Sequence, residues 1–368
     1  MQQPEKRIII SGGGSGGHIF PAIAIANAMK ETWPNAKILF IGAKGKMEME
    51  KVPQAGYQIE GLWISGLQRK LSIQNISFPL KLISSMWKAR KIIKKFKPDL
   101  VVGVGGFASG PTLQQAAAMK IPTLIQEQNS YPGITNIWLS KKVDKICVSY
   151  DGLDKFFPKE KIYLTGNPVR KAVVDIAGKR EEAARFFSLD PNVKTVLVVG
   201  GSLGARTINE AIEAHLEEFT KKGIQLIWQT GINYYPQAAK AILKANNPSL
   251  KVFQFINQMD LAYAQADIVI SRAGAIAISE LCLVGKPVIL VPSPFVAEDH
   301  QTKNALALVT YNAAVLVKDQ ELKENLWPEL DALIQDDDRQ EKLKANILAL
   351  GKPQATESII AVAKTLIN

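Results

Sequence analysis

The sequence predicts an α/β fold in which two similar domains are each built around a parallel sheet. Short apolar runs alternate with helical patterns along the whole chain, which is typical of βα units. These runs are continuous in Val, Ile and Leu, as expected for strands that are covered on both faces. A strand, a glycine-rich turn and a helix begin at Ile8, and the same plan returns about 190 residues later at Val196.

Length and composition fit this interpretation. The chain has 368 residues, of which 47% are hydrophobic and 21% charged, so it is long enough for two domains and unlike disordered, collagen-like or coiled-coil sequences. No apolar run approaches the about 18 residues of a membrane-spanning helix. The two cysteines, Cys147 and Cys282, lie in no CxxC spacing. We therefore expect a reduced compartment, no disulfide and no thiolate metal site.

Ten strands are expected from the apolar runs, five in each half of the chain. They cover 7–11, 37–41, 100–104, 123–126, 145–148, 195–199, 224–229, 252–255, 268–271 and 287–291. The domain boundary is expected within 165–190, where Gly166-Asn167-Pro168 interrupts the pattern and a charged helix follows. The predicted domains are residues 1–170 and 171–368, with the final helix able to pack back on the first domain.

The first glycine-rich turn matches a dinucleotide fingerprint only formally, at Gly12, Gly14 and Gly17. An NAD site needs an acidic residue at the end of the second strand, which binds the ribose. Here Lys44 follows that strand, so an NADP site stays open as an alternative. The GxxxxGK[ST] phosphate loop is absent from the sequence, which excludes nucleotide hydrolysis by that mechanism.

Three further glycine-rich turns follow expected strands, at 103–111, 200–204 and 271–275. Any one of them could be only a tight turn between a strand and a helix. Together they lie at the carboxyl ends of two parallel sheets, where open α/β folds bind their ligands. We expect the two sheet edges to face each other across a cleft.

The segment 267–280 carries the most chemistry. A helix is expected to begin near Ala275, so the N–H groups of Gly274, Ala275 and Ile276 could bind a diphosphate at its positive end. Glu280 follows about one and a half turns later, where a carboxylate can accept two hydrogen bonds from a ribose diol. The alternative is a solvent-facing helical glutamate, but the neighbouring residues are apolar.

Histidine is scarce, and only two of the three lie near expected strand ends. His18 follows the first glycine-rich turn, and His300 lies in a polar loop. No HxxxH or HExxH spacing occurs, so we expect no zinc site.

The positive charge is concentrated in the first half. Residues 1–170 have 24 basic and 11 acidic residues, a net charge of +13, whereas residues 171–368 have 21 and 23, a net charge of −2. The window 61–98 has nine basic residues and no acidic one. A charge confined to one stretch favours an anionic membrane surface over nucleic acid as the partner.

A helix is expected over 79–98. One side of it would carry Lys81, Lys88, Lys91 and Lys95. Apolar surface would come from Leu80, Ile83, Met86, Trp87 and Ile93, with Leu71, Ile73, Ile76 and Phe78 just upstream. The alternative is an ordinary amphipathic helix that packs on its own sheet and has solvated lysines.

Seven ordered blocks cover nearly the whole chain: SGGGSGGHIFPA (11–22), GVGGFASGP (103–111), QEQN (126–129), GNPVR (166–170), GGSLGAR (200–206), SRAGAIAISE (271–280) and EDHQTKNA (298–305). In this order they resemble the GT-B glycosyltransferases, and within them the bacterial enzymes that add N-acetylglucosamine to the lipid-linked peptidoglycan precursor. The resemblance implies two Rossmann-like domains with parallel sheets that face each other across a cleft.

The resemblance also implies the reaction and the partners. N-acetylglucosamine would pass with inversion from UDP-N-acetylglucosamine to the C4 hydroxyl of the N-acetylmuramoyl unit of lipid I, undecaprenyl-pyrophosphoryl-N-acetylmuramoyl-pentapeptide. The product would be lipid II for peptidoglycan synthesis in cell-wall biogenesis, cell division and cell shape. The enzyme would be peripheral on the cytoplasmic face of the inner membrane, would need no cofactor or metal, and would bind no nucleic acid.

Site residues follow from the same resemblance. Donor binding is implied for Ser15, Gly16, Gly17, Asn129, Arg170, Ser202, Ile256, Ala275, Ile276, Ala277, Ile278, Ser279, Glu280 and Gln301. Among these, Ile256 would meet the uracil, Glu280 the ribose, and Gln301 the sugar hydroxyls. Ser202 and 275–279 would meet the donor diphosphate, and Arg170 would add positive charge.

The acceptor diphosphate would lie near Gly14, Gly105 and Gly106, in a site that 15–17 also shape. His18 is the candidate catalytic base because a neutral imidazole near pH 7 is suited to accept a proton. Glu127 is the rival, and His18 could instead only orient the acceptor diphosphate. Two departures from the family pattern are Ser15, where a threonine is frequent and the hydroxyl is kept, and Thr302, where some members have a second glutamine.

Three other functions remain open from the sequence. One is a related GT-B transferase with another lipid acceptor, such as diacylglycerol. The second is an NADP-dependent oxidoreductase that uses the Gly12 turn. The third is a non-catalytic module that binds a nucleotide sugar.

Overall fold

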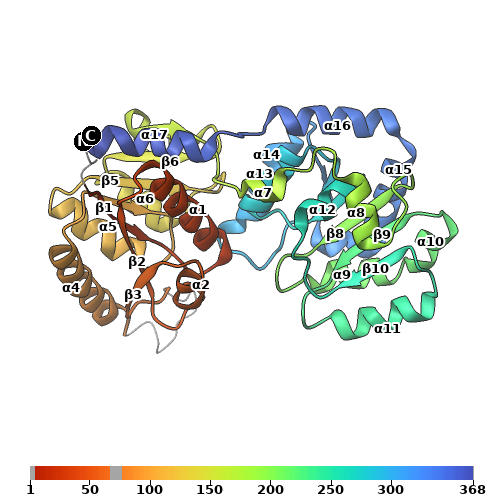
Figure 1. Cartoon of the computed structure of the whole chain (residues 1–368), viewed down its shortest axis with the longest axis horizontal. Coiled ribbons are helices and arrows are strands. Elements are labelled where there is room, and N and C mark those ends of the chain that lie inside the picture. The colour runs from red at the N-terminus through yellow and green to blue at the C-terminus, as the bar shows by residue number, and fades with distance from the viewer. Residues whose placement is uncertain (1–4, 67–76, 368) are drawn as a thin grey trace. The chain divides into compact units, whose positions relative to one another are not determined.

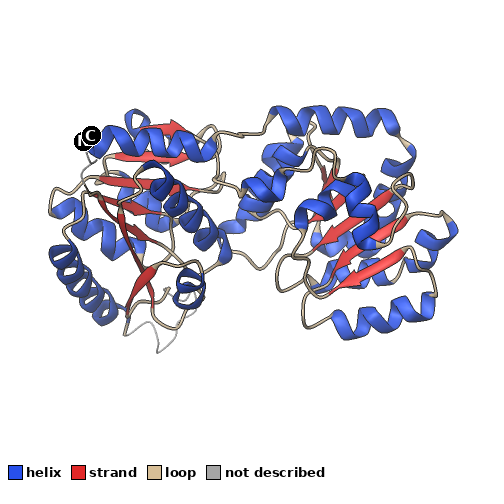
Figure 2. Ribbon diagram, viewed as in Figure 1, coloured by secondary structure: helices blue, strands red, loops and turns tan. Residues whose placement is uncertain are grey.

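The computed structural model describes residues 5–66 and 77–367. The chain forms two compact units, of which unit 1 is Met1–Val169 with Gln354–Asn368 and unit 2 is Arg170–Pro353. Each unit has one sheet with helices on both faces (Figures 1 and 2). Every strand pair in the described part of the chain is parallel, which confirms the predicted fold class.

Unit 1 has a seven-stranded sheet in the order β3-β2-β1-β4-β5-β6-β7. Its strands are β1 (Arg7–Ser11), β2 (Lys37–Ala43), β3 (Gln58–Leu62), β4 (Leu100–Gly103), β5 (Thr123–Glu127), β6 (Lys145–Val148) and β7 (Ile162–Leu164). Its helices are α1 (Gly16–Thr32), α2 (Glu48–Gln54), α4 (Phe78–Phe96), α5 (Ser109–Ala118), α6 (Ile134–Ser140) and α17 (Ala355–Ile367).

Both faces of this sheet are buried. Ile8 and Ile10 of β1 contribute to one core with α1 and α17, which lie side by side (Figure 1). Ile9 points to the opposite face and packs with α4, α5 and α6. Because successive strand residues alternate between the two faces, a continuous Ile-Ile-Ile run is needed to fill both cores. Each such side chain contributes about 1.5–3 kcal/mol on burial.

Unit 2 has a six-stranded sheet in the order β10-β9-β8-β11-β12-β13. Its strands are β8 (Thr195–Val199), β9 (Gln225–Gln229), β10 (Leu250–Phe253), β11 (Ile268–Ser271), β12 (Val288–Leu290) and β13 (Val315–Leu316). Its helices are α7 (Lys171–Val174), α8 (Arg180–Phe187), α9 (Arg206–Glu213), α10 (Leu216–Lys221), α11 (Tyr235–Ala245), α12 (Met259–Gln265), α13 (Ala275–Val284), α14 (His300–Val309), α15 (Leu322–Gln335) and α16 (Asp337–Ala349).

The largest differences between the expected and observed strands concern the sheet edges, whereas the inner strands differ by at most two residues at an end. The strands β3, β7 and β13 were not expected, and β10 lies two residues earlier than the expected 252–255. An edge strand has one neighbour and leaves part of its surface in water, so its sequence lacks the continuous apolar run of an inner strand. The burial of β3 and β7 is accordingly incomplete.

Each sheet has one position at which the strand order reverses, and ligands of open α/β folds bind at such positions. In unit 1 the strand order reverses between β1 and β4, and in unit 2 it reverses between β8 and β11. Connections from adjacent strands then leave in opposite directions, which opens a crevice at the carboxyl ends of the strands. The four glycine-rich turns follow these four strands.

Candidate functional site

A pocket of about 490 Å³ opens in unit 2 at the carboxyl ends of β8 and β11. It is lined by the β8–α9 loop, the β11–α13 loop and the segment after β12. Its lining residues are Val199, Gly200, Gly201, Gly204, Ala205, Arg206, Thr207, Ser271, Arg272, Gly274, Ala277, Ser293, Phe295 and Gln301. Two glycine-rich turns that lie far apart in the sequence thus form one pocket, as their predicted strand positions indicated.

The N-terminus of α13 opens beside this pocket. Gly274 is the N-cap residue, and a side chain added there would contact no other residue, so a ligand can approach the backbone closely. The N–H of Ile278 donates to the Gly274 carbonyl. The N–H groups without an intrahelical acceptor are therefore those of 275–277, because they precede the first closed turn. Of the segment 275–279, which was predicted to bind a diphosphate, only the first three residues therefore have backbone N–H groups that can donate to a ligand.

Glu280 lies deeper on the same helix. Its side chain is only 12% exposed, and Arg170 Nη2 lies 3.8 Å from its Oε1. Burial raises the pKa of Glu280 to about 7, and the Arg170 charge opposes this shift. Burial also raises the pKa of Tyr263, with a further contribution from Glu280. Glu280 is therefore a buried carboxyl group, and the solvent-facing alternative is wrong.

Local hydrogen bonds fix Ile256, which is expected near the uracil, and Gln301, which is expected near the sugar hydroxyls. The N–H of Ile256 donates to Gln229 Oε1 (2.9 Å), and Gln229 Nε2 donates to the Gly201 carbonyl (3.0 Å). Gln301 Oε1 accepts the N–H of Ser293 (2.8 Å), which directs its amide nitrogen as the donor for a ligand. Gln229, at the end of β9, was not predicted. It links the segment around Ile256 to the β8–α9 loop at Gly201.

A buried ion pair holds the pocket loops together. Arg272 and Asp319 pair with side chains 14% and 10% exposed. Arg272 Nη2 also donates to Thr207 Oγ1 (3.0 Å), which donates to Asp319 (2.7 Å). These contacts join the β11–α13 loop to α9 and to the 3₁₀ turn before α15. This network was not predicted from the sequence, because only the fold brings residues 207, 272 and 319 together.

In unit 1, the loops after β1 and β4 contact each other directly. A side chain on Gly106 would lie 2.3 Å from the Gly13 carbonyl oxygen, and one on Gly105 would lie 2.9 Å from His18 Nε2. Both glycines also have a positive φ, so no other residue fits there. Ser15 is the N-cap of α1, and Gly16 and Gly17 form its first turn. The predicted residues of the loops after β1 and β4 therefore gather at the N-terminal end of α1.

His18 is held at this point by backbone. Its Nδ1 lies 3.0 Å from the Gly13 carbonyl oxygen and 3.4 Å from Ser15 Oγ. A carbonyl oxygen only accepts hydrogen bonds, so Nδ1 carries the proton in this contact and the neutral ring has its lone pair on Nε2. That is the arrangement a general base needs.

Glu127 is held quite differently. It is 1% exposed, and its Oε1 accepts two hydrogen bonds from Asn129 while its Oε2 accepts one each from Gly133 and Asn136. Four donors occupy both oxygens, which leaves little capacity to accept a substrate proton. Glu127 thus shapes the turn that carries Asn129.

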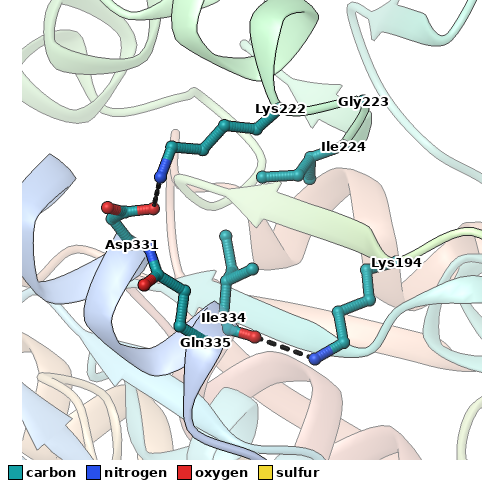
Figure 3. A pocket seen from close by; sticks show the side chains of 7 residues that line it. All are labelled: Lys194, Lys222, Gly223, Ile224, Asp331, Ile334 and Gln335. Carbon is teal, nitrogen blue, oxygen red and sulfur yellow. Dashed lines mark hydrogen bonds and ion pairs between the residues drawn. The ribbon is translucent and has the colours of Figure 1, made fainter.

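A second pocket in unit 2, of about 430 Å³, lies at the opposite, amino ends of β8 and β9. Figure 3 shows Lys222 directed at Asp331 and Lys194 at the carbonyl of Ile334. The hydrogen bond from Lys222 lowers the pKa of Asp331. Lys194 also pairs with Asp337. Acidic and carbonyl groups of the chain itself pair with both lysines. Unlike the first pocket, this one therefore does not present them to an anionic ligand.

Comparison with known proteins agrees with this geometry. The model of the glycosyltransferase family 28 N-terminal domain matches residues 8–148, and the model of the family 28 C-terminal domain matches residues 195–359. The chain belongs to glycosyltransferase family 28. The glycine-rich loops of both sheets lie within the two matched segments.

Family 28 relatives match over the full length. The "UDP-N-acetylglucosamine--N-acetylmuramyl-(pentapeptide) pyrophosphoryl-undecaprenol N-acetylglucosamine transferase" of Cytophaga hutchinsonii is 56% identical over 367 residues, which is 100% of this chain and 98% of that one. The enzyme of the same name from Christiangramia forsetii is 54% identical over 362 residues, 98% of each chain. A crystal structure of Acinetobacter baumannii MurG has a TM-score of 0.78 at 25% identity and covers 98% of this chain and 100% of its own.

The structure also places the remaining predicted serines, Ser202 and Ser279, and a further side chain beside the first glycine-rich loop. Ser202 is exposed on the β8–α9 loop, and Ser279 Oγ donates to the Ala275 carbonyl (2.9 Å) within α13. The N–H of Gly14 is taken by Glu48, a residue the sequence analysis missed. Among the described residues, no group of three or more His, Cys, Asp or Glu could hold a metal ion.

The Arg272–Asp319 pair makes a prediction about stability. Replacing Asp319 with alanine leaves a buried guanidinium without its carboxylate, which costs about 3–5 kcal/mol. We expect urea unfolding of the Asp319→Ala variant to show a loss of this size in the free energy of unfolding. In steady-state kinetics, the same variant should have a higher KM for the donor. The matched control is Asp338→Ala, which removes an exposed acid of the same unit. Equal stability of the two variants would contradict the prediction.

Proposed function

We propose that this chain transfers N-acetylglucosamine from UDP-N-acetylglucosamine to the C4 hydroxyl of the N-acetylmuramoyl unit of lipid I, which forms lipid II. The observation that carries the proposal is the 56% identity to a relative with this activity in its name, over the whole length of both chains. The glycine-rich loops at both sheet switch points support it, because open α/β folds bind ligands there.

The donor belongs to unit 2. The N–H groups of 275–277 donate hydrogen bonds to the diphosphate at the positive end of α13. Glu280 accepts a hydrogen bond from each of the two ribose hydroxyls, and Gln301 donates one to the sugar. When the glycosidic bond breaks, negative charge builds on the departing UDP. Preorganised amides and the nearby Arg170 stabilise that charge without reorganisation, so the proposed mechanism requires no metal or other cofactor.

The acceptor belongs to unit 1. The first-turn amides of α1 and the β4–α5 loop bind its diphosphate, and His18 Nε2 takes the proton of the attacking hydroxyl. The hydroxyl oxygen then attacks the anomeric carbon from the face opposite UDP, which inverts its configuration. Asn129, held by Glu127, contributes a hydrogen bond to the transferred sugar. The cleft in which the two ligands meet stays a prediction.

Lipid I is membrane-bound, and α4 gives unit 1 a surface for reaching it. Leu80, Ile83 and Trp87 lie on one stripe of α4 and are 65%, 66% and 73% exposed. The exposed Lys91 and Lys94 continue this stripe. We propose that this surface, the α4 stripe, docks reversibly on anionic lipid at the cytoplasmic face of the inner membrane. No described helix is both long and apolar enough to span a bilayer.

Part of the expected basic face is used differently. Lys81 donates to Ser65 and Lys88 donates to the Gly61 carbonyl, so both side chains fold against the protein. Ile93 is completely buried in the core, and its expected place on the apolar surface is wrong. Leu71, Ile73 and Ile76 lie outside the described residues.

Binding to vesicles tests the α4 stripe. Each exposed cation contributes about 1 kcal/mol near anionic lipid, so the double variant Lys91→Gln/Lys94→Gln should bind phosphatidylglycerol vesicles about 30-fold more weakly. The control Lys240→Gln/Lys244→Gln removes two exposed lysines from α11 of unit 2 and should bind like the unaltered protein. If the amount of protein that sediments with the vesicles does not depend on their anionic lipid content or on the salt concentration, the proposal is wrong.

Release of UDP tests the function itself. Steady release is expected with UDP-N-acetylglucosamine and lipid I together, unchanged by EDTA, and not with diacylglycerol as the acceptor. Release with diacylglycerol but without lipid I would establish the related glycolipid transferase instead. Membership of family 28 gives the NADP alternative no support, and calorimetry with UDP and NADPH should show binding of UDP alone.

A further inference from the structure

A buried glutamate lies directly beneath the first glycine-rich loop. Glu48 begins α2 and is 1% exposed. Its Oε2 accepts the N–H of Gly14 (2.9 Å), and its Oε1 accepts the N–H of Ala43 at the end of β2 (3.0 Å). The carboxylate therefore ties the loop after β1 to the neighbouring strand.

The chain is shaped to admit this carboxylate. A side chain on Gly13 would lie 2.2 Å from the Glu48 carboxyl group, and one on Gly42 would lie 2.5 Å from its Cγ. Gly13 and Gly14 also have φ values of +147° and +87°, which other residues rarely adopt. Gly13 of the loop and Gly42 of β2 thus leave room for the Glu48 side chain, and the positive φ of Gly14 belongs to the turn whose N–H Glu48 accepts.

The hydrogen bond from Gly14 reaches His18 through one peptide group. The N–H of Gly14 and the carbonyl of Gly13 belong to the same planar peptide, in which they point in opposite directions. Glu48 holds the N–H, and the carbonyl then points at His18 Nδ1, 3.0 Å away. A carboxylate bonded to the N–H also polarises the peptide and makes the carbonyl a better acceptor.

We propose that Glu48 is a positioning residue for the transfer reaction: it fixes the peptide between Gly13 and Gly14 and, through it, the orientation and tautomer of His18. This refinement rests on the proposed function only for its effect on rate. The effect on the imidazole follows from the contacts alone, and it is measured without any substrate.

The test uses Glu48→Gln in the full chain. The amide keeps the shape but has one accepting oxygen, so one of the two N–H donors faces an NH₂ group. In ¹⁵N spectra of the unaltered protein, the neutral His18 ring should carry its proton on Nδ1. In Glu48→Gln the ring should shift toward the tautomer mixture of a solvent-exposed histidine. With only three histidines in the chain, the spectrum of His18→Gln identifies the signals.

Kinetics give the second readout. Misplacement of the base should lower kcat about 10- to 100-fold, while the KM for UDP-N-acetylglucosamine stays within about twofold because the main donor contacts lie in unit 2. The matched control is Glu50→Gln, an exposed glutamate on the same helix, for which both readouts should be unchanged. If Glu48→Gln does not fold, Gly42→Ala displaces the same side chain from outside the loop and should give the same tautomer shift.

The possible outcomes distinguish the effect of Glu48 on the His18 ring from the role of His18 in the reaction. An unchanged His18 tautomer in a folded Glu48→Gln or Gly42→Ala variant would overturn the inference, whatever the rate. A shifted tautomer with an unchanged kcat would support positioning by Glu48 and remove His18 from the role of base. A shift together with a lower kcat supports both.

Discussion

Replacing His18 with alanine is expected to lower kcat at least about 100-fold, because the attacking hydroxyl then loses the group that takes its proton. The KM for UDP-N-acetylglucosamine should change little, since the imidazole lies in unit 1 beside the Gly13 carbonyl. The measurement is steady-state UDP release with saturating lipid I.

Two further variants make this result specific. His215→Ala removes a histidine of unit 2 that stacks on Trp327, and kcat should stay near normal. Glu127→Gln should disturb the turn at Asn129 and raise KM more than it lowers kcat. Near-normal turnover by His18→Ala, or a collapse of kcat in Glu127→Gln alone, would contradict the assignment of the base.

Removal of the Glu280 carboxylate should have the largest effect on donor binding. Hydrogen bonds to a charged group are each worth about 1.5–3 kcal/mol, so the loss of two to a ribose diol in Glu280→Ala should weaken UDP binding at least about 100-fold. Calorimetry with UDP measures this directly. The control Glu324→Gln alters an exposed glutamate of the same unit.

The ribose itself provides the sharper test. The 2′-deoxy and 3′-deoxy forms of UDP should each bind the unaltered protein about tenfold or more weakly, but should bind Glu280→Ala as well as UDP does. Equal losses in both proteins would show that Glu280 does not contact the diol. The cycle isolates this one interaction even if the variant is less stable.

Binding of UDP should also release a proton. Burial raises the pKa of Glu280 to about 7, so the carboxyl group is mostly protonated at pH 6 in the free protein. A diol that donates two hydrogen bonds favours the carboxylate and lowers this pKa, so affinity should fall as the pH drops below about 7. The measurement uses UDP-N-acetylglucosamine, because its diphosphate, unlike the terminal phosphate of UDP, has no proton to lose at pH 6. Calorimetry at pH 6 in buffers of different ionisation enthalpy should detect the released proton, and Glu280→Gln should abolish the release.

The candidate site was predictable wherever a single segment carries it. The turn after β11 and the helix that follows it were expected at the positions that the structure shows, because a strand, a glycine and a helix N-terminus are contiguous in sequence. The partners that hold this site were not predictable. Asp319 follows Arg272 by 47 residues, and no local pattern links them.

The same distinction applies to unit 1. His18 was predicted from its place after a glycine-rich turn, whereas Glu48 was not, because nothing in 46–50 distinguishes it from the exposed Glu50. Only the pairing of β1 with β2 brings α2 beneath the loop and makes one of these glutamates part of the site.

The sequence alone determined the inner strands, the two glycine-loop pairs and the presence of two parallel sheets, because each depends on short contiguous patterns of apolar residues and glycine. The tertiary structure decided three things: the edge strands, the distant side chains that hold each glycine-rich loop, such as Asp319 and Glu48, and which polar side chains became buried. Burial and partner choice depend on segments that are distant in the chain, and the energy of a polar group depends on both.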